Sequence, residues 1–122
     1  MKAIQLSAPG GLDSLQLVDL PEPEAPRAGE ITVRLSASSL NYHDLLVATS
    51  PRSEGRLIPM SDGAGVVVAT GDCVTEFAVG DSVVSCFFPQ WQSGHHVPTH
   101  FATVPGDGVD GFARGAVTLP AT

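Results

Sequence analysis

The stretch formed by residues 58–87 constrains the fold of this chain more than any other. It contains two valine-rich runs, residues 64–69 and 83–87, and each run is bounded by glycine or by a Gly-Asp pair. Short apolar runs between such turn residues are typical of strands joined by tight turns, and not of helices. The stretch therefore predicts a β-meander.

Glycines divide this stretch and have two expected roles. Gly63 and Gly65 stand where the first strand begins, and glycine at such a place usually marks a bulge or a close approach of another backbone segment. Gly71 and Gly80 mark turns, and each is followed by an aspartate that can accept hydrogen bonds from backbone N–H groups. Three apolar side chains are expected to anchor the connection between these turns in the core: Val74, Phe77 and Val79.

The remaining strand signals are short and separated by turns. Residues 2–6 and 15–20 flank a Pro-Gly-Gly turn and predict a β-hairpin. Residues 30–39 alternate apolar and polar side chains, which is the period of a strand with one buried face. Residues 112–119 return to strand character. With 13 glycines and 10 prolines in 122 residues, the composition also favours one domain built from many short strands.

Two segments depart from strand character. Residues 40–49 contain no glycine or proline, and Asn41, near their start, can cap a helix. We therefore expect a short helix there. Residues 88–110 contain repeated proline and glycine and predict a long loop. The chain has two cysteines, which are expected to be free thiols, and Cys86 is interpreted as a small core residue of an apolar strand.

Charge and the N-terminal segment exclude several classes of function. Six lysines and arginines against 13 aspartates and glutamates give a formal net charge of -7, which repels nucleic-acid phosphates and anionic membranes. The N-terminal segment MKAIQLSAPG leads into no sustained apolar run, so neither a secretory signal nor a membrane span is expected. We therefore expect a cytoplasmic protein that binds neither nucleic acid nor membranes.

The central stretch also carries a resemblance to a known family. Its spaced residues resemble the signature of the GroES-like catalytic domain that opens the medium-chain dehydrogenases/reductases, in the order Gly65, Val67, Gly71, Val74, Phe77, Val79, Gly80, Asp81 and Val83. The resemblance implies a mainly β fold, a GroES-like partly open β-barrel with one or two short helices. It also implies that residues 1–122 form the catalytic, substrate-side domain. The family's Rossmann cofactor domain would follow Thr122 and is absent from this chain.

The resemblance further implies a branch that works without zinc. Zinc-dependent members hold the metal with a cysteine at the start of the short helix and a His-Glu pair before the glycine-rich strand. Here those places are Asn41, Ser61 and Asp62. An amide and a hydroxyl do not replace the thiolate and imidazole of a stable zinc site. The chain thus looks like the zinc-independent quinone oxidoreductases and enoyl reductases, which implies NADP or NAD as cofactor and a small carbonyl, enone or quinone as substrate.

Polar residues at the expected helix start are the catalytic candidates: Asn41, Tyr42 and His43. Asn41 has an amide that can donate to cofactor or substrate, and it serves equally well as a helix cap. His43 can relay protons, although a surface or satisfied histidine is the favoured interpretation. Asp44 is expected to stabilise the helix N-terminus rather than act on substrate. Ser61 is a candidate for cofactor binding with Asp62 beside it, and a turn role for Asp62 stays open.

Two further patterns predict turns rather than sites. His95, His96 and His100 suggest a metal, but Pro98 disfavours a helix there and no acidic or thiol partner lies in the same loop. The glycines at 106, 108 and 111 match G-x-G-x-x-G literally. No buried parallel strand precedes them and no helix is expected to follow, so a turn-rich loop explains them.

The alternative to an enzyme domain is a truncated GroES-like module that serves in binding or assembly. Arg114 and Gly115, which replace the acidic and aromatic residues usual in the family, favour this alternative. In either case we expect the isolated chain to be inactive, because the cofactor's main binding surface is missing. We also expect a face that the second domain would cover to be exposed and to favour homo-oligomers.

Overall fold

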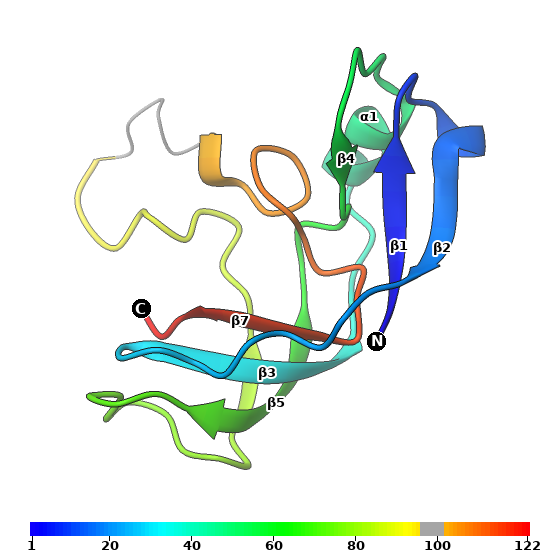
Figure 1. Cartoon of the computed structure of the whole chain (residues 1–122). Helices are drawn as coiled ribbons and strands as arrows, with labels where there is room; N and C mark the ends of the chain where they lie inside the picture. Colours follow the sequence, from blue (N-terminus) through cyan, green and yellow to red (C-terminus); the bar gives the residue numbers. More distant parts are fainter. Residues whose placement is uncertain (96–101) are drawn as a thin grey trace.

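Two antiparallel sheets that run across one another form the architecture of the chain (Figure 1). The computed structural model describes residues 1–95 and 102–122. The smaller sheet has the order β2-β1-β4 and the larger sheet the order β6-β5-β3-β7. The elements are β1 (Lys2–Ser7), the 3-10 turn η1 (Leu12–Ser14), β2 (Leu15–Asp19), β3 (Glu30–Ala37), α1 (Tyr42–Thr49), β4 (Arg56–Leu57), β5 (Ala64–Thr70), β6 (Ser82–Val84) and β7 (Ala116–Pro120).

The N-terminal hairpin is confirmed and forms most of the smaller sheet. β1 pairs antiparallel with β2 and, on its other edge, with the short β4. Gly10 and Gly11 make the turn with φ values of 86° and 89°, which side chains rarely tolerate. Gly11 also donates its N–H to the carbonyl of Ala48 at 3.0 Å, so the hairpin turn holds the end of α1.

The core lies on the larger sheet, and β3 is its central strand. The strand predicted for residues 30–39 is confirmed as β3, in which Ile31 and Val33 are each 3% exposed and join Val67, Phe112 and Val117 in one apolar cluster. The predicted alternation holds only in part, because Thr32 is also buried and Ala37 is exposed. β3 pairs antiparallel with β5 on one side and with β7 on the other. The last strand of the chain therefore packs against the first strand of the larger sheet and closes the core.

Gly65 allows β3 and β5 to approach closely, as the sequence predicts. A Cβ atom at this position would collide with the backbone carbonyl of Arg34 on β3. The pairing of the two strands also shifts register between Leu35 and Ala37, beside the place where Gly65 pairs. Glycine is therefore required here for a bulged, tightly paired ladder.

Two expectations for the extent of strands were wrong, and so was one for a core residue. β6 ends at Val84 rather than continuing to residue 87, and beyond its end Phe87 and Phe88 pack edge to face at 4.8 Å. Cys86 is consequently exposed and is not a core residue, although both cysteines are free as expected. The final strand begins at Ala116 rather than at residue 112.

Backbone contacts with residues 58–60 explain the late start of the final strand. The N–H groups of Gly111, Phe112 and Ala113 donate to the carbonyls of Ile58, Met60 and Pro59 at 2.6, 2.9 and 3.0 Å respectively. These contacts keep residues 111–113 out of the ladder with β3.

The connection between β5 and β6 reaches the core through two of its three expected anchors. Val74 and Phe77 pack against the core cluster, whereas Val79 is 65% exposed because it precedes the tight turn at Gly80. The carboxylate of Asp81 accepts a hydrogen bond from the N–H of Ala78 at 2.8 Å, as expected for an aspartate in a turn.

Helices contribute little to the fold. Within the two described ranges the helical residues lie in α1, in the 3-10 turn η1 and in a 3-10 stretch at residues 102–103. α1 is the short helix that the sequence predicts. No helix in those ranges is long and apolar enough to cross a bilayer. The mainly β prediction is confirmed, and the two sheets form a partly open barrel.

The close approach at Gly65 is tested by Gly65→Ala. We expect this variant to lose about 1–3 kcal/mol of unfolding free energy, because the added methyl group forces β3 and β5 apart. Urea unfolding followed by circular dichroism measures the loss. Gly115→Ala is the matched control, since a Cβ there would make an ordinary contact of 3.5 Å with Met1. Equal stabilities of the two variants would contradict the close packing.

Candidate functional site

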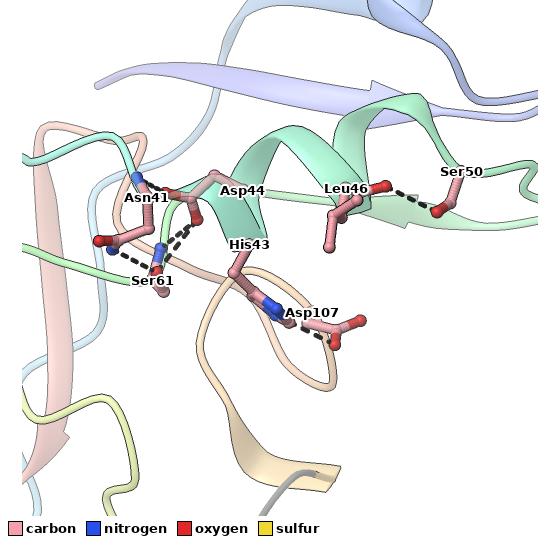
Figure 2. Close-up of polar contacts among 7 residues, drawn as sticks. All are labelled: Asn41, His43, Asp44, Leu46, Ser50, Ser61 and Asp107. Atoms are coloured by element: carbon pink, nitrogen blue, oxygen red, sulfur yellow. Dashed lines mark hydrogen bonds and ion pairs between the residues drawn. The ribbon is translucent and has the colours of Figure 1, made fainter.

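A buried carboxylate, that of Asp44, organises the polar site at the start of α1 (Figure 2). Asp44 is 5% exposed. Its carboxylate accepts the backbone N–H of Asn41 at 2.8 Å, the backbone N–H of Ser61 at 2.9 Å and the hydroxyl of Ser61 at 3.1 Å. Hydrogen bonds to an ionised acceptor are about twice as strong as neutral ones. Asp44 therefore fixes both the helix start and Ser61.

The side chain of Asn41 completes this network. Asn41 is the N-cap residue of α1 and forms a capping box with Asp44. Its amide nitrogen Nδ2 donates to the hydroxyl oxygen of Ser61 at 3.0 Å and to the carboxylate of Asp62 at 2.9 Å. The structure thus brings together Asn41, Ser61 and Asp62, the residues that stand where the zinc-dependent relatives are expected to hold their metal. We call Asn41, Asp44, Ser61 and Asp62 the polar cluster.

The backbone of Met60, the residue before Ser61, is strained. Met60 has a φ of 81°, which costs a residue with a side chain about 1–3 kcal/mol. A Cβ atom on Gly106 would lie 2.7 Å from the backbone nitrogen of Met60, so glycine is required where the two segments meet. This strained turn buries Ser61 completely, with 0% exposure.

The other two catalytic candidates lie apart from the polar cluster. His43 points from α1 toward the loop formed by residues 104–111 (Figure 2). Its Nε2 atom lies 3.3 Å from a carboxylate oxygen of Asp107, and its ring meets that of Phe87 edge to face at 5.4 Å. Tyr42 is 74% exposed on the surface beside Asn41.

The glycine-rich loop of residues 104–111 has a structural role. Pro105 and Val109 form an isolated bridge, and a side chain on Gly108 would collide with the carbonyl of Ala102. The carboxylate of Asp110 accepts the N–H of Ile58 at 2.9 Å. The strand β7, and not a helix, follows this loop. Gly106 and Gly108 lie in turns, as the predicted turn-rich loop requires, whereas Gly111 follows the turns and donates its N–H to the carbonyl of Ile58.

A hollow of about 920 Å³ lies between the larger sheet and the segments around residues 85–92 and 103–112. Phe77, Phe88 and Trp91 give it apolar walls, and Gly63, the neighbour of Asp62, is part of its lining. Asp62 of the polar cluster is therefore the sequence neighbour of a residue that lines this hollow.

Arg114 is a charged residue in the lining of the hollow. Its Nε atom is buried without a hydrogen-bond partner. Burial lowers the pKa of Arg114, and the nearby Asp110 carboxylate opposes this shift.

The histidine pattern in the second half of the chain gives no metal centre in the described structure. His95 is exposed, while His96 and His100 lie outside the described residues. Among residues 1–95 and 102–122, no group of three or more histidine, cysteine, aspartate or glutamate side chains is placed to hold a metal ion.

Sequence reasoning underestimated Asp44. It assigns this residue to the helix N-terminus, whereas the structure shows that the same carboxylate also holds Ser61 from a distant segment. The spacing of Asn41 and Asp44, three residues apart before an apolar run, is the signal of a capping box. No local pattern indicates that Ser61 would lie against it.

Comparison with known proteins identifies the family. The model of the alcohol dehydrogenase GroES-like domain matches residues 27–122. The chain belongs to this family. A zinc-type alcohol dehydrogenase-like protein of Schizosaccharomyces pombe is 37% identical to the GroES-like chain over 116 residues, which cover 91% of the chain and 33% of the relative. The human synaptic vesicle membrane protein VAT-1 homolog-like is 32% identical over 114 residues, which cover 88% of the chain and 26% of the relative.

Solved structures agree with this assignment. An NAD-dependent alcohol dehydrogenase superposes with a TM-score of 0.77 at 32% identity, covering 99% of the GroES-like chain and 38% of that structure. The Pseudomonas syringae quinone oxidoreductase superposes with a TM-score of 0.66 at 34% identity, covering 98% and 31%. These neighbours place the chain among the medium-chain dehydrogenases/reductases. The chain spans about a third of the length of the relatives that it matches.

The central role of Asp44 is tested by Asp44→Asn. The new amide would direct hydrogens at groups that are themselves donors, so we expect a loss of about 3 kcal/mol of unfolding free energy. Chemical denaturation measures the change. Asp13→Asn, at an exposed position of η1, is the matched control and is expected to leave stability almost unchanged. A loss no larger than that of the control would show that Asp44 does not organise the cluster.

Proposed function

We propose that this chain is the substrate-side domain of an NAD(P)-dependent, zinc-independent oxidoreductase that reduces a small carbonyl, enone or quinone compound. The polar cluster is the observation that carries this proposal. It places an amide, a hydroxyl and a carboxylate together where zinc-dependent relatives are expected to place a thiolate, an imidazole and a carboxylate.

The side chains of Asn41, Ser61 and Asp62 support a role without metal. Zinc sites in proteins are built mainly from thiolate, imidazole and carboxylate ligands. Asn41 instead directs amide hydrogens at Ser61 and Asp62, and hydrogens repel a cation. The fission-yeast relative is named a zinc-type protein, but that name describes the relative.

Exposed side chains beside the polar cluster support the proposed binding of a nicotinamide nucleotide. Leu40, 82% exposed, and Tyr42 flank Asn41 and offer apolar surface to a flat ring, while the cluster offers polar atoms to its substituents. The nicotinamide supplies the hydride when it is bound, and the protein contributes orientation and hydrogen bonds. Tyr42 is 74% exposed, and its hydroxyl could donate to negative charge developing on a substrate oxygen.

The proposal is tested on the full-length product of the gene that encodes this chain. With NADPH or NADH and a panel of quinones, enones and aldehydes, we expect reduced nicotinamide to be consumed, which its absorbance reports. Incubation with phenanthroline should leave the rate unchanged, and elemental analysis should find no stoichiometric zinc. Loss of activity on chelation, restored by zinc, would contradict a zinc-independent enzyme.

The isolated chain provides a second arm of this test. Its described residues form no β-α-β unit for a nucleotide, so we expect no turnover from residues 1–122 alone. A folded longer protein that neither binds nor oxidises NADPH or NADH would favour the assembly module over the enzyme.

A further inference from the structure

The hollow beside the larger sheet is a separate place from the polar cluster. None of the four residues of the cluster belongs to its lining. Its volume of about 920 Å³ lies within the range of about 300–1,000 Å³ that is usual for pockets that hold small molecules. Apolar side chains of β3 and β7 line it, together with the rings of Phe77, Phe88 and Phe112. The hollow therefore offers an apolar surface to a ligand.

Two charged side chains interrupt this apolar lining, those of Asp110 and Arg114. The ion pairs within residues 1–95 and 102–122 do not include Arg114. Its Nε atom is buried and has no hydrogen-bond partner in this part of the chain. Arg114 as a whole is half-buried, so the part of it that lines the hollow is open to a ligand.

Asp110 compensates the charge of Arg114 only in part. One oxygen of its carboxylate accepts the backbone N–H of Ile58 at 2.9 Å, which holds it on the neighbouring segment. Its negative charge opposes the effect of burial on Arg114, yet burial is the larger influence and lowers the pKa of the guanidinium. An arginine keeps its charge in proteins, and a partly buried charge without a hydrogen-bonded partner is costly. The lining thus contains a cation that still lacks an anion.

The chemistry of the missing anion follows from its surroundings. The planar fork of a guanidinium matches the two oxygens of a carboxylate, and the hydrogen bonds of such a pair are strong. A phosphate dianion would bring two negative charges close to Asp110, whereas a carboxylate brings one. The apolar walls around Arg114 favour a carboxylate that is attached to an apolar body, because burial of that body in the hollow is itself favourable.

We propose that this hollow binds a small monocarboxylic acid with an apolar body, and that the carboxylate of this ligand pairs with the guanidinium of Arg114. The body of the ligand lies against the rings of Phe77, Phe88 and Phe112. This site is additional to the polar cluster, and its occupation requires neither a nicotinamide nucleotide nor turnover.

Three probes test the proposal by calorimetry on the wild-type, full-length product of the gene. Octanoate has both the charge and the apolar body, octanamide has the body without the charge, and acetate has the charge without the body. We expect octanoate to bind at least about tenfold more tightly than octanamide, and acetate to give no measurable binding. Absence of octanoate binding, or equal affinities for octanoate and octanamide, would overturn the proposal.

Variants of Arg114 locate the site. Arg114→Met keeps an unbranched apolar stem and removes the charge, so we expect octanoate to bind about tenfold more weakly and octanamide to bind as it does to the wild type. Arg114→Lys keeps the charge but not the fork, and its affinity for octanoate should lie between those of the wild type and Arg114→Met. Arg34→Met, which replaces an exposed arginine of β3, is the matched control and should bind octanoate normally.

The result that excludes Arg114 is equal octanoate affinity in the wild type and in Arg114→Met. Thermal unfolding of each variant shows whether it is folded. If Arg114→Met does not fold, the more conservative Arg114→Lys and the three probes on the wild type decide the question. Oxidation of nicotinamide nucleotide is measured separately on the same protein, so this proposal and the proposed function fail independently.

Discussion

The site depends on one buried negative charge, that of Asp44. A carboxylate removed from water is costly unless its oxygens receive hydrogen bonds, and here two backbone N–H groups and one hydroxyl supply them. Asn41 and Ser61 lie 20 positions apart in the sequence, and Asp44 is bonded to both. The helix start and the segment before β5 are therefore held as one unit.

The strands supply the frame for that unit. Residues 58–60 are bonded through their backbone to residues 110–113, which lead into β7 at the edge of the larger sheet. The segment that carries Ser61 is therefore held between α1 on one side and the chain before β7 on the other. Its left-handed Met60 is tolerated because both sides fix it.

Local patterns in the sequence were sufficient where a segment's own residues decide its structure. β3 follows from the period of two in residues 30–39, and α1 follows from a capping residue ahead of a stretch without glycine or proline. Gly65 was interpretable because a glycine at the start of an apolar strand indicates a bulge or a close backbone approach, and the structure shows both beside Gly65.

Contacts between distant segments decided the features that the sequence left open. β6 stops at Val84, before Phe87 and Phe88 pack on each other, and nothing in the valine-rich run indicates that. The contact of His43 with Asp107 joins residues far apart in the chain. The candidate residues Asn41 and Ser61 came from the family resemblance, and their direct hydrogen bond came only from the structure.

The hydrogen bonds of the Asn41 amide also limit what a single substitution at this position can achieve. Replacing Asn41 with cysteine alone would not install a zinc ion, because the lost amide would leave the Ser61 hydroxyl oxygen and the Asp62 carboxylate without their donor. Ser61 would still be bonded to Asp44 and would still lack an imidazole. A single substitution at Asn41 therefore deprives two residues of the distant segment before β5 of the one hydrogen-bond donor that they share.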